Sequence, residues 1–336
     1  MRILVTGITG FAGSHLAEVL LARPGVDVFG ASRTARWPES ARHLAERVPL
    51  RVCDLANGAK VETLLQDVQP QQIFHLAGYP HVGRSMREPD AAWMTNLTAT
   101  RNLYEAVLRW GGRPRILYVG SGQIYGDPEA ADQAFDERCT LRPTTPYGAS
   151  KAAADLASYQ YTRTAGLEIV LARPFNQIGP RQAPEFAVAH FARQIAAIEQ
   201  GRQSPLLETG NLNPRRDMTD VRDAVRAYVL LMDKGKSGEA FNVGTGRAYS
   251  MQEVVNRLLA LAGVQAEVRQ RPDLVRSRDI AEIRADATKL RRETGWAPLI
   301  ALDQSLTDTL AYWRAVENPS EAAAPGTETH FKGPSP

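Results

Sequence analysis

The sequence predicts an α/β protein: a doubly wound parallel sheet with a smaller, interleaved α/β domain. Three observations favour this fold class. The chain begins with a short apolar run that leads through three evenly spaced glycines into a helical pattern. Strand-like and helix-like segments then alternate through residue 174, as in parallel sheets with crossover helices. At 336 residues, the chain has room for one large domain or two interleaved domains.

The N-terminal segment predicts a strand, a glycine turn and a helix. Residues 2–6 are β-rich, and residues 14–22 have helical apolar spacing. Between them, Gly7 suits a tight turn, Gly10 the close approach of a pyrophosphate, and Gly13 close packing of helix on strand. Such a repeat also fits a purely structural turn. The dinucleotide site that it predicts comprises Gly7, Gly10, Phe11, Ala12 and Gly13.

The end of the next predicted strand, residues 26–33, indicates which cofactor is bound. An acidic side chain here would bind the ribose 2′-hydroxyl of NAD, but the chain has Ser32 followed by Arg33. A guanidinium group binds a 2′-phosphate well, so NADP(H) is preferred over NAD(H). The alternative is that Arg33 and Arg36 are solvated loop residues.

Further strands and helices complete the alternation. Asp54, near the end of the third strand, is placed to meet the adenine edge. The predicted strands are residues 49–55, 71–78, 115–121 and 167–174, and the predicted helices between them are 101–110 and 147–166.

A tyrosine four residues before a lysine opens the helix predicted over 147–166. Tyr147 and Lys151 share a helix face, and Ser121 ends a strand where open α/β sheets bind their ligands. A nearby ammonium group is expected to lower the pKa of the Tyr147 phenol, so that it donates a proton near neutral pH. Ser121 would hydrogen-bond the same substrate oxygen. The alternative is a core tyrosine and a solvated lysine.

The sequence resembles the extended short-chain dehydrogenases/reductases, many of which act on nucleotide sugars. The resemblance implies a Rossmann fold in which Ser121, Tyr147 and Lys151 are catalytic and Lys151 also holds the nicotinamide ribose. It further implies cofactor contacts from Leu55, Leu76, Ala77 and Gly78, and a homodimer formed by the helices that bear Asn96 and Tyr147. The motifs that carry it are TGITGFAG (6–13), Asp54-Leu55, HLAG (75–78), Asn96, Ser121, YGASK (147–151) and RPFNQIGP (173–180).

The second half indicates a nucleoside diphosphate site. Arg215, Arg216, Arg276 and Arg278 are candidate diphosphate clamps, because planar guanidinium groups bind phosphate oxygens, although each alone is equally a surface residue. GNLNPRRD (210–217) resembles a pattern of enzymes that act on GDP-mannose derivatives, so GDP is the preferred nucleotide. The predicted substrate-binding residues are Ser85, Gln123, Asn176, Asn211, Arg216 and Arg276.

Residue 123 separates two activities within this resemblance. Dehydration needs a carboxylate to remove the C5 proton, and the dehydratases resemble Thr-x-Glu-x-Tyr-Gly where this chain has SGQIYG (121–126). Gln123 cannot accept that proton. The missing base favours NADPH-dependent reduction of a GDP-4-keto-6-deoxy-mannose, although residues 81–89 resemble the dehydratases. A nucleotide-sugar 4-epimerase and a non-catalytic NADP-binding regulator remain alternatives.

Composition excludes several other classes. Forty basic and thirty-seven acidic residues give a net charge of +3, which predicts no nucleic-acid surface, and no apolar run is long enough for a membrane span. Cys53 and Cys139 provide neither a disulfide framework nor zinc spacing, so no metal is expected. The N-terminal segment has no signal-peptide pattern, which favours the cytoplasm.

Two interleaved domains and a tail are expected from the order of these segments. The NADP-binding domain is predicted to comprise residues 1–174 and about 217–245. The nucleotide-sugar domain takes about 175–216 and 246–315, with helices over 184–201 and 250–263. Residues 316–336, rich in Pro, Ala, Gly and Ser, predict a flexible tail.

Overall fold

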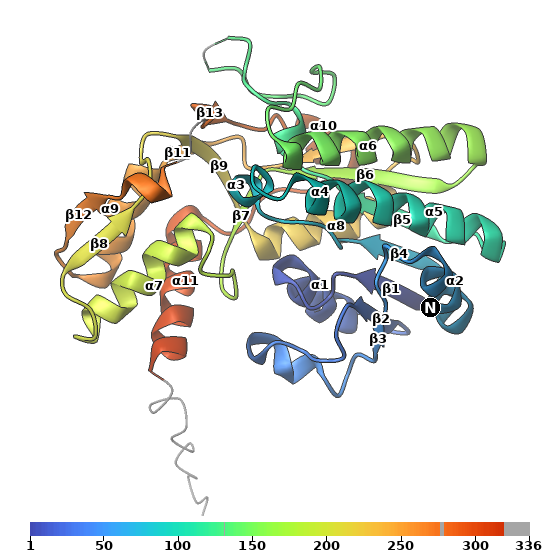
Figure 1. The fold of residues 1–336 in the computed structure, drawn as a ribbon, viewed down its shortest axis with the longest axis horizontal. Helices are drawn as coiled ribbons and strands as arrows, with labels where there is room; N and C mark the ends of the chain where they lie inside the picture. The colour runs from blue at the N-terminus through green and yellow to red at the C-terminus, as the bar shows by residue number, and fades with distance from the viewer. Residues whose placement is uncertain (131, 276–278, 319–336) are drawn as a thin grey trace, which may run out of the picture.

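The computed structural model describes residues 1–130, 132–275 and 279–318. Figure 1 shows a large sheet with helices on both faces and a smaller lobe beside it. The N-terminus lies in the larger part, and the last described helix lies in the smaller lobe.

The large sheet has seven parallel strands in the order β10-β6-β5-β4-β1-β2-β3. Strand order runs outward in both directions from β1 and β4, which places the ligand crevice beyond the carboxyl ends of these two strands. The predicted fold class is confirmed, and β10, from the second half of the chain, forms one edge of this sheet. The strands are β1 (Arg2–Thr6), β2 (Asp27–Ser32), β3 (Leu50–Val52), β4 (Gln72–His75), β5 (Arg115–Val119), β6 (Glu168–Pro174) and β10 (Ala240–Val243).

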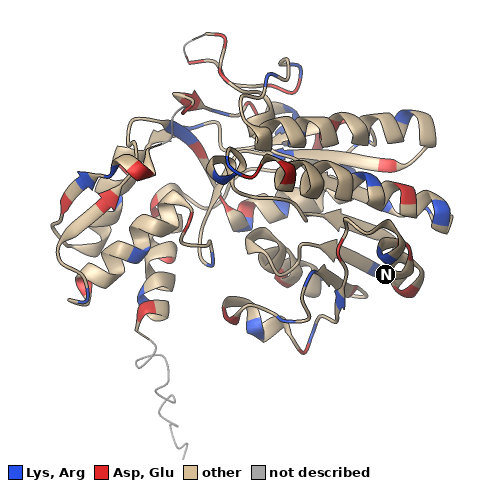
Figure 2. Ribbon diagram, viewed as in Figure 1, with Lys and Arg blue, Asp and Glu red and all other residues tan. Residues whose placement is uncertain are grey.

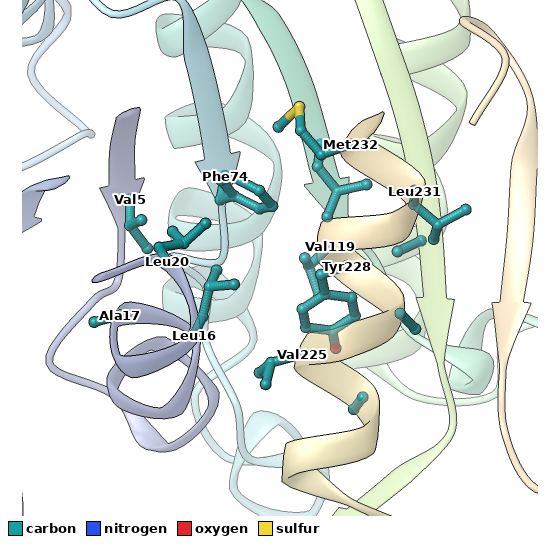
Figure 3. Packing of buried hydrophobic residues seen from close by; sticks show 14 of the residues in the cluster. Val5, Leu16, Ala17, Leu20, Phe74, Val119, Val225, Tyr228, Leu231 and Met232 are labelled. Atoms are coloured by element: carbon teal, nitrogen blue, oxygen red, sulfur yellow. The ribbon is translucent and has the colours of Figure 1, made fainter. Parts of the chain in front are cut away.

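Helices cover both faces of this sheet because its strands are apolar on both sides. In β1, Ile3 and Val5 face one core and Leu4 faces the other, as the two-residue period of a strand requires. The first core, part of which Figure 3 shows around Val5, Phe74 and Tyr228, includes α1 (Phe11–Leu21), η1 (Glu39–Leu44), α8 (Val221–Lys234) and α10 (Thr288–Thr294). The second core includes α2 (Gly58–Val68), α5 (Ala99–Trp110) and α6 (Pro146–Ala165).

The smaller lobe has its own apolar core and two small sheets. The core lies among the helices α7 (Ala187–Glu199), α9 (Met251–Ala262) and α11 (Leu302–Glu317). One sheet pairs β8 (Leu206–Thr209) with β12 (Glu267–Gln270), and the other joins β7 (Asn176–Ile178), β9 (Arg215–Asp220), β11 (Ala248–Ser250) and β13 (Glu282–Ile283). The remaining short helices of the described residues are α3 (Val82–Ser85), α4 (Pro89–Trp93), the π-helix η2 (Met94–Thr98), and the 3-10 turns η3 (Gly122–Ile124) and η4 (Pro272–Leu274).

The chain passes repeatedly between the two parts. It leaves the large sheet after β6 for β7, returns from β9 into α8, and leaves again from β10 to β11. Asp220 is both the last residue of β9 and the N-cap of α8, where its side chain accepts a hydrogen bond from Arg222 N at 2.8 Å. No linker therefore separates a strand of the smaller sheet from a helix of the larger core.

Element ends differ from prediction by a few residues. β4 ends at His75 rather than at residue 78, because Ala77 N turns to the Thr6 hydroxyl at 3.2 Å instead of continuing the ladder. At the other end of the chain, α11 continues through Glu317, whose carboxylate accepts hydrogen bonds from Arg193 and Arg202. Residues 316 and 317 are thus helical, and most of the predicted tail, residues 319–336, lies outside the described residues.

Candidate active site

The glycine turn after β1 is shaped by backbone contacts. Gly7 has φ +71°, and a Cβ there would lie 2.8 Å from Ala77 N. A Cβ on Gly13 would lie 2.3 Å from Gly7 O, so helix and turn are in direct backbone contact. Gly10 caps α1 without a side-chain hydrogen bond, and Phe11 and Ala12 form the first turn. The helix N-terminus therefore has no side chain competing for its N–H groups, which suits a phosphate.

The ends of β2 and β3 meet the adenosine side of the predicted cofactor site. Ser32 Oγ lies 3.2 Å from Thr9 Oγ1 and accepts a hydrogen bond from Thr34 N at 3.3 Å. Arg33 is exposed and, within the described part of the chain, has no hydrogen-bond or ion-pair partner. One oxygen of exposed Asp54 accepts a hydrogen bond from Ala56 N at 3.0 Å, while Leu55 is buried beneath it.

Lys151 lies at the carboxyl edge of the sheet with its side chain 5% exposed. Its Nζ donates to Val119 O at 2.9 Å, which leaves two of its N–H donors without a partner among the described residues. Burial lowers the pKa of Lys151 to about 8, and the nearby Asp155 carboxylate opposes this effect. A Cβ on Gly78 would lie 3.1 Å from this Nζ, so the HLAG segment, with Leu76 and Ala77, borders the lysine.

Tyr147 lies in the first turn of α6, which has Thr145 as its N-cap and Pro146 as its first residue. Thr145 Oγ1 accepts a hydrogen bond from Gly148 N at 3.1 Å, and proline is favourable at the first helical position. Ser121, the residue that follows the end of β5 by two positions, lies close enough to the Tyr147 side chain to influence the pKa of the phenol. The structure therefore brings together all three residues predicted to be catalytic.

The expected lowering of the Tyr147 pKa is wrong. Burial raises the pKa of this phenol, and the nearby Ser121 offsets only part of the effect. Lys151 does not contribute to the lowering; its ammonium group donates a hydrogen bond to Val119 O instead. Tyr147 thus keeps its proton at neutral pH, which suits a proton donor.

Ser85 contacts Tyr147, and Gln123 contacts Ser121. Ser85 is fully buried; its hydroxyl donates to Val82 O at 2.6 Å and accepts from Tyr147 N at 3.1 Å. It holds the start of α6 rather than presenting a free hydroxyl. Gln123 donates through its backbone N to Ser121 Oγ at 3.2 Å, and its half-buried side chain has no partner within the described residues.

Asn176 and Arg216 lie on strands of the four-stranded sheet, and Asn211 lies between β8 and β9. Asn176 is exposed at the start of β7, and Asn211 Oδ1 accepts a hydrogen bond from Asn213 N at 3.1 Å. Arg216 is buried and already bonded to Asp279 and Ile280 O, each at 2.7 Å, so its guanidinium is not an open clamp. Arg215 pairs with Glu253 and Glu282. The candidates Arg276 and Arg278 lie outside the described residues.

Two further features escaped the sequence analysis. The ring of His81, in the segment after β4, stacks on that of Phe186, just before α7, at 5.0 Å and 17°. This contact joins the large part to the smaller lobe, and no sequence pattern connects the two residues. Asp155 forms a buried ion pair with Arg173, and its position four residues after Lys151 was the available signal.

The described residues also show how charged groups, helices and potential metal ligands are arranged. Basic and acidic residues are interspersed over the ribbon in the view of Figure 2. The helices of the described part of the chain are too short or too polar to span a bilayer. Residues 1–130, 132–275 and 279–318 contain no cluster of three or more His, Cys, Asp or Glu side chains suited to a metal ion.

Comparison with known proteins shows that most of the chain is similar to nucleotide-sugar enzymes. A family model described as GDP-mannose 4,6 dehydratase matches residues 4–309. GDP-6-deoxy-D-mannose reductase of Pseudomonas aeruginosa is 33% identical over 94% of this chain and 97% of its own length.

Two solved structures show the same likeness in three dimensions. RMD from Pseudomonas aeruginosa complexed with NADPH superimposes with a TM-score of 0.82 at 32% identity, covering 94% of this chain and 99% of that one. UDP-glucose 4-epimerase of Thermus thermophilus complexed with NAD gives a TM-score of 0.83 at 31% identity, with the same coverage. The likeness therefore extends to enzymes of different activity and cofactor.

Proposed function

Because the chain belongs to the GDP-mannose 4,6-dehydratase family, a group of NAD(P)-dependent short-chain dehydrogenase/reductase enzymes with a Rossmann fold, we propose that it reduces the C4 ketone of GDP-4-keto-6-deoxy-D-mannose to GDP-D-rhamnose. The observation that carries this proposal is that residue 123, whose backbone N donates to Ser121 Oγ, has an amide rather than a carboxylate side chain. Among the described residues, no carboxylate contributes to the pKa of Tyr147. Without a carboxylate, removal of a C5 proton has no base, whereas ketone reduction needs none.

Three residues of this chain perform the proposed proton chemistry. Ser121 and Tyr147 donate hydrogen bonds to the C4 oxygen, and Tyr147, which retains its proton, gives that proton to the developing alkoxide. Charged Lys151 stabilises the phenolate left behind, and its two open N–H donors suit the hydroxyls of a ribose. When bound, the nicotinamide cofactor supplies the hydride that attacks C4.

NADPH is the proposed reductant. Gly7, Gly10 and Gly13 shape a turn that fits a pyrophosphate, and Ser32 stands where an acidic residue would repel a 2′-phosphate. Exposed Arg33 supplies a free guanidinium next to it. A relative solved with NADPH supports this choice, although the similar epimerase carries NAD.

GDP is the proposed nucleotide, by similarity to the named reductase. Asn176 and Asn211 are candidates for contacts with the sugar nucleotide, and Arg276 for its diphosphate. Burial of Arg216 makes it a support for this site rather than a clamp. Residues 1–174 with about 217–245 would bind the cofactor, and 175–216 with 246–315 the sugar nucleotide. We also propose that the protein forms a homodimer and is located in the cytoplasm.

A second candidate is dehydration of GDP-mannose itself, which the matching family model favours. One experiment separates the alternatives. Purified protein is mixed with GDP-4-keto-6-deoxy-mannose and NADPH or NADH, the loss of nicotinamide absorbance is followed, and the sugar is identified by NMR. We expect reduction with NADPH and GDP-rhamnose as product; hydride delivery to the opposite face would give GDP-6-deoxy-talose.

Parallel samples test the other activities. Formation of a 4-keto sugar from GDP-mannose alone would establish a dehydratase. Interconversion of UDP-sugars without added reductant, by protein that retains NAD, would establish a 4-epimerase. Tight NADPH binding with no turnover of any sugar nucleotide would leave the non-catalytic regulator, and each of these results would contradict the reductase.

A further inference from the structure

We propose that Asp155 and Arg173 form a positioning pair that keeps the Lys151 ammonium group charged; the inference rests on the function proposed above. Arg173 Nε donates to Asp155 Oδ2 at 2.9 Å, and its Nη2 donates to Oδ1 at 2.7 Å. The two residues are 2% and 7% exposed. The pair is thus a bidentate contact shielded from water, the strongest geometry for this kind of ion pair.

Asp155 lies one helical turn after Lys151 on the same face of α6. A buried ammonium group loses its charge readily unless an anion lies nearby. Burial lowers the pKa of Lys151 to about 8, and Asp155 is the group that raises it. The charged and titratable groups that act on or contact Lys151 are Asp155 on α6, His75 on β4 and Tyr118 on β5, whose ring lies 5.5 Å from Nζ. Tyr147 precedes Lys151 by one turn of α6, and Arg173 on β6 pairs with Asp155.

Arg173 explains how Asp155 can serve as that anion. A lone carboxylate in the core would take up a proton to avoid the cost of a buried charge, and the guanidinium compensates for this cost. A second contact extends the effect: Arg173 Nη1 donates to the Tyr125 hydroxyl at 2.9 Å, which donates to Asn242 Oδ1 at 2.8 Å. Tyr125 follows Gln123 by two residues, so one guanidinium supports both the lysine side and the serine side of the site.

The pair and the fold can be tested separately. Replacing both partners of a buried ion pair with uncharged side chains of similar size is often neutral for stability, whereas removal of one partner leaves an unpaired buried charge. The test variant is therefore the double substitution Asp155→Asn with Arg173→Met. Asp67→Asn is the control, because Asp67 is exposed and pairs with Arg51 at the far edge of the sheet.

The measurement is a titration of Lys151 by NMR with lysine labelled at Cε. The chain contains six lysines, and the signal missing from a Lys151→Arg sample identifies the one of interest. We expect a midpoint near pH 8 in the wild type and in the control. In the double variant, the midpoint should fall by about one pH unit or more, as loss of a nearby opposite charge produces. The alkaline limit of NADPH oxidation should move with it.

The outcomes distinguish this inference from the proposed function. If the wild type oxidises no NADPH with the keto sugar, the function fails, but the lysine titration still tests the pair. An unchanged midpoint in the folded double variant would overturn the inference. If that variant does not fold, Asp155→Leu with Arg173→Met is titrated instead. Failure of both to fold would show that the pair serves stability alone and would equally overturn it.

Discussion

Gly10 offers a direct test of the phosphate site. Its backbone, at φ −79° and ψ 177°, lies in the extended region that any residue adopts, so alanine fits without backbone strain. A Cβ there would meet only Gly7 O within 4 Å, at 3.1 Å, a tight contact that a small shift of this backbone oxygen would relieve. The Gly10→Ala variant should therefore fold with a loss of about 1 kcal/mol or less, the cost of a poorer N-cap.

Cofactor binding should suffer far more than folding. The added methyl group occupies the space through which a pyrophosphate approaches the N-terminus of α1. Loss of one hydrogen bond to a charged group costs about 1.5–3 kcal/mol. Since about 1.4 kcal/mol is a tenfold change, the Kd for NADPH should rise about ten- to hundredfold.

Two other glycines provide the controls. A Cβ on Gly58, the first residue of α2, would meet nothing closer than 3.7 Å, so Gly58→Ala should change neither binding nor folding adversely. Gly13→Ala, with its Cβ 2.3 Å from Gly7 O, should lower the stability of the protein itself. Fluorescence titration with NADPH and thermal unfolding compare the three. An unchanged Kd in folded Gly10→Ala would mean that Gly10 serves only the turn and that the phosphates lie elsewhere.

Four further changes have distinct expected results. Tyr147→Phe should abolish NADPH oxidation while NADPH binding stays nearly intact; unchanged turnover would remove Tyr147 from the chemistry. Arg33→Ala should weaken NADPH much more than NADH in a binding titration, and equal losses would place the 2′-phosphate elsewhere. The Gln123→Glu variant should exchange the C5 hydrogen of the keto sugar for deuterium in heavy water, because it gains a carboxylate two residues after Ser121. NMR detects this exchange. Absence of exchange would show that more than residue 123 separates the reductase from the dehydratase activity. Burial lowers the pKa of His75 to about 3. Below about pH 6.5, only the unfolded state therefore binds a proton at this imidazole. The free energy of unfolding should fall by about 1.4 kcal/mol per pH unit as acid is added. A His75→Gln variant should lose less stability between about pH 6 and pH 4, and equal slopes in chemical denaturation would contradict this assignment.

Local patterns were sufficient for much of the fold. The alternation of apolar strands and amphipathic helices predicted the sheet, because period and chain order largely determine a doubly wound topology. The glycine turn and the Tyr147–Lys151 spacing indicated a candidate site for the same reason: each is a short-range relation along the chain.

Properties that depend on distant partners could not be predicted in this way. The pKa of Tyr147 is decided by burial, which requires the packed structure. Arg216 was a reasonable phosphate ligand by residue type, but Asp279, a remote residue, already binds it. Ser85 likewise supports Tyr147 across 62 positions of sequence. In each case the residue type suggested a role, but the sequence did not identify the residue with which it interacts.

The repeated passage of the chain between the large sheet and the smaller lobe has an evolutionary consequence. Asp220 ends a strand of one and begins a helix of the other, and only Phe175 separates β6 from β7. A new substrate specificity therefore cannot be acquired by exchanging one contiguous segment of the chain, because each of the two parts is built from several separate segments. Divergence within such an architecture must proceed by point substitutions and loop changes on an undivided scaffold, which is consistent with one framework shared by the reductase and the epimerase it resembles.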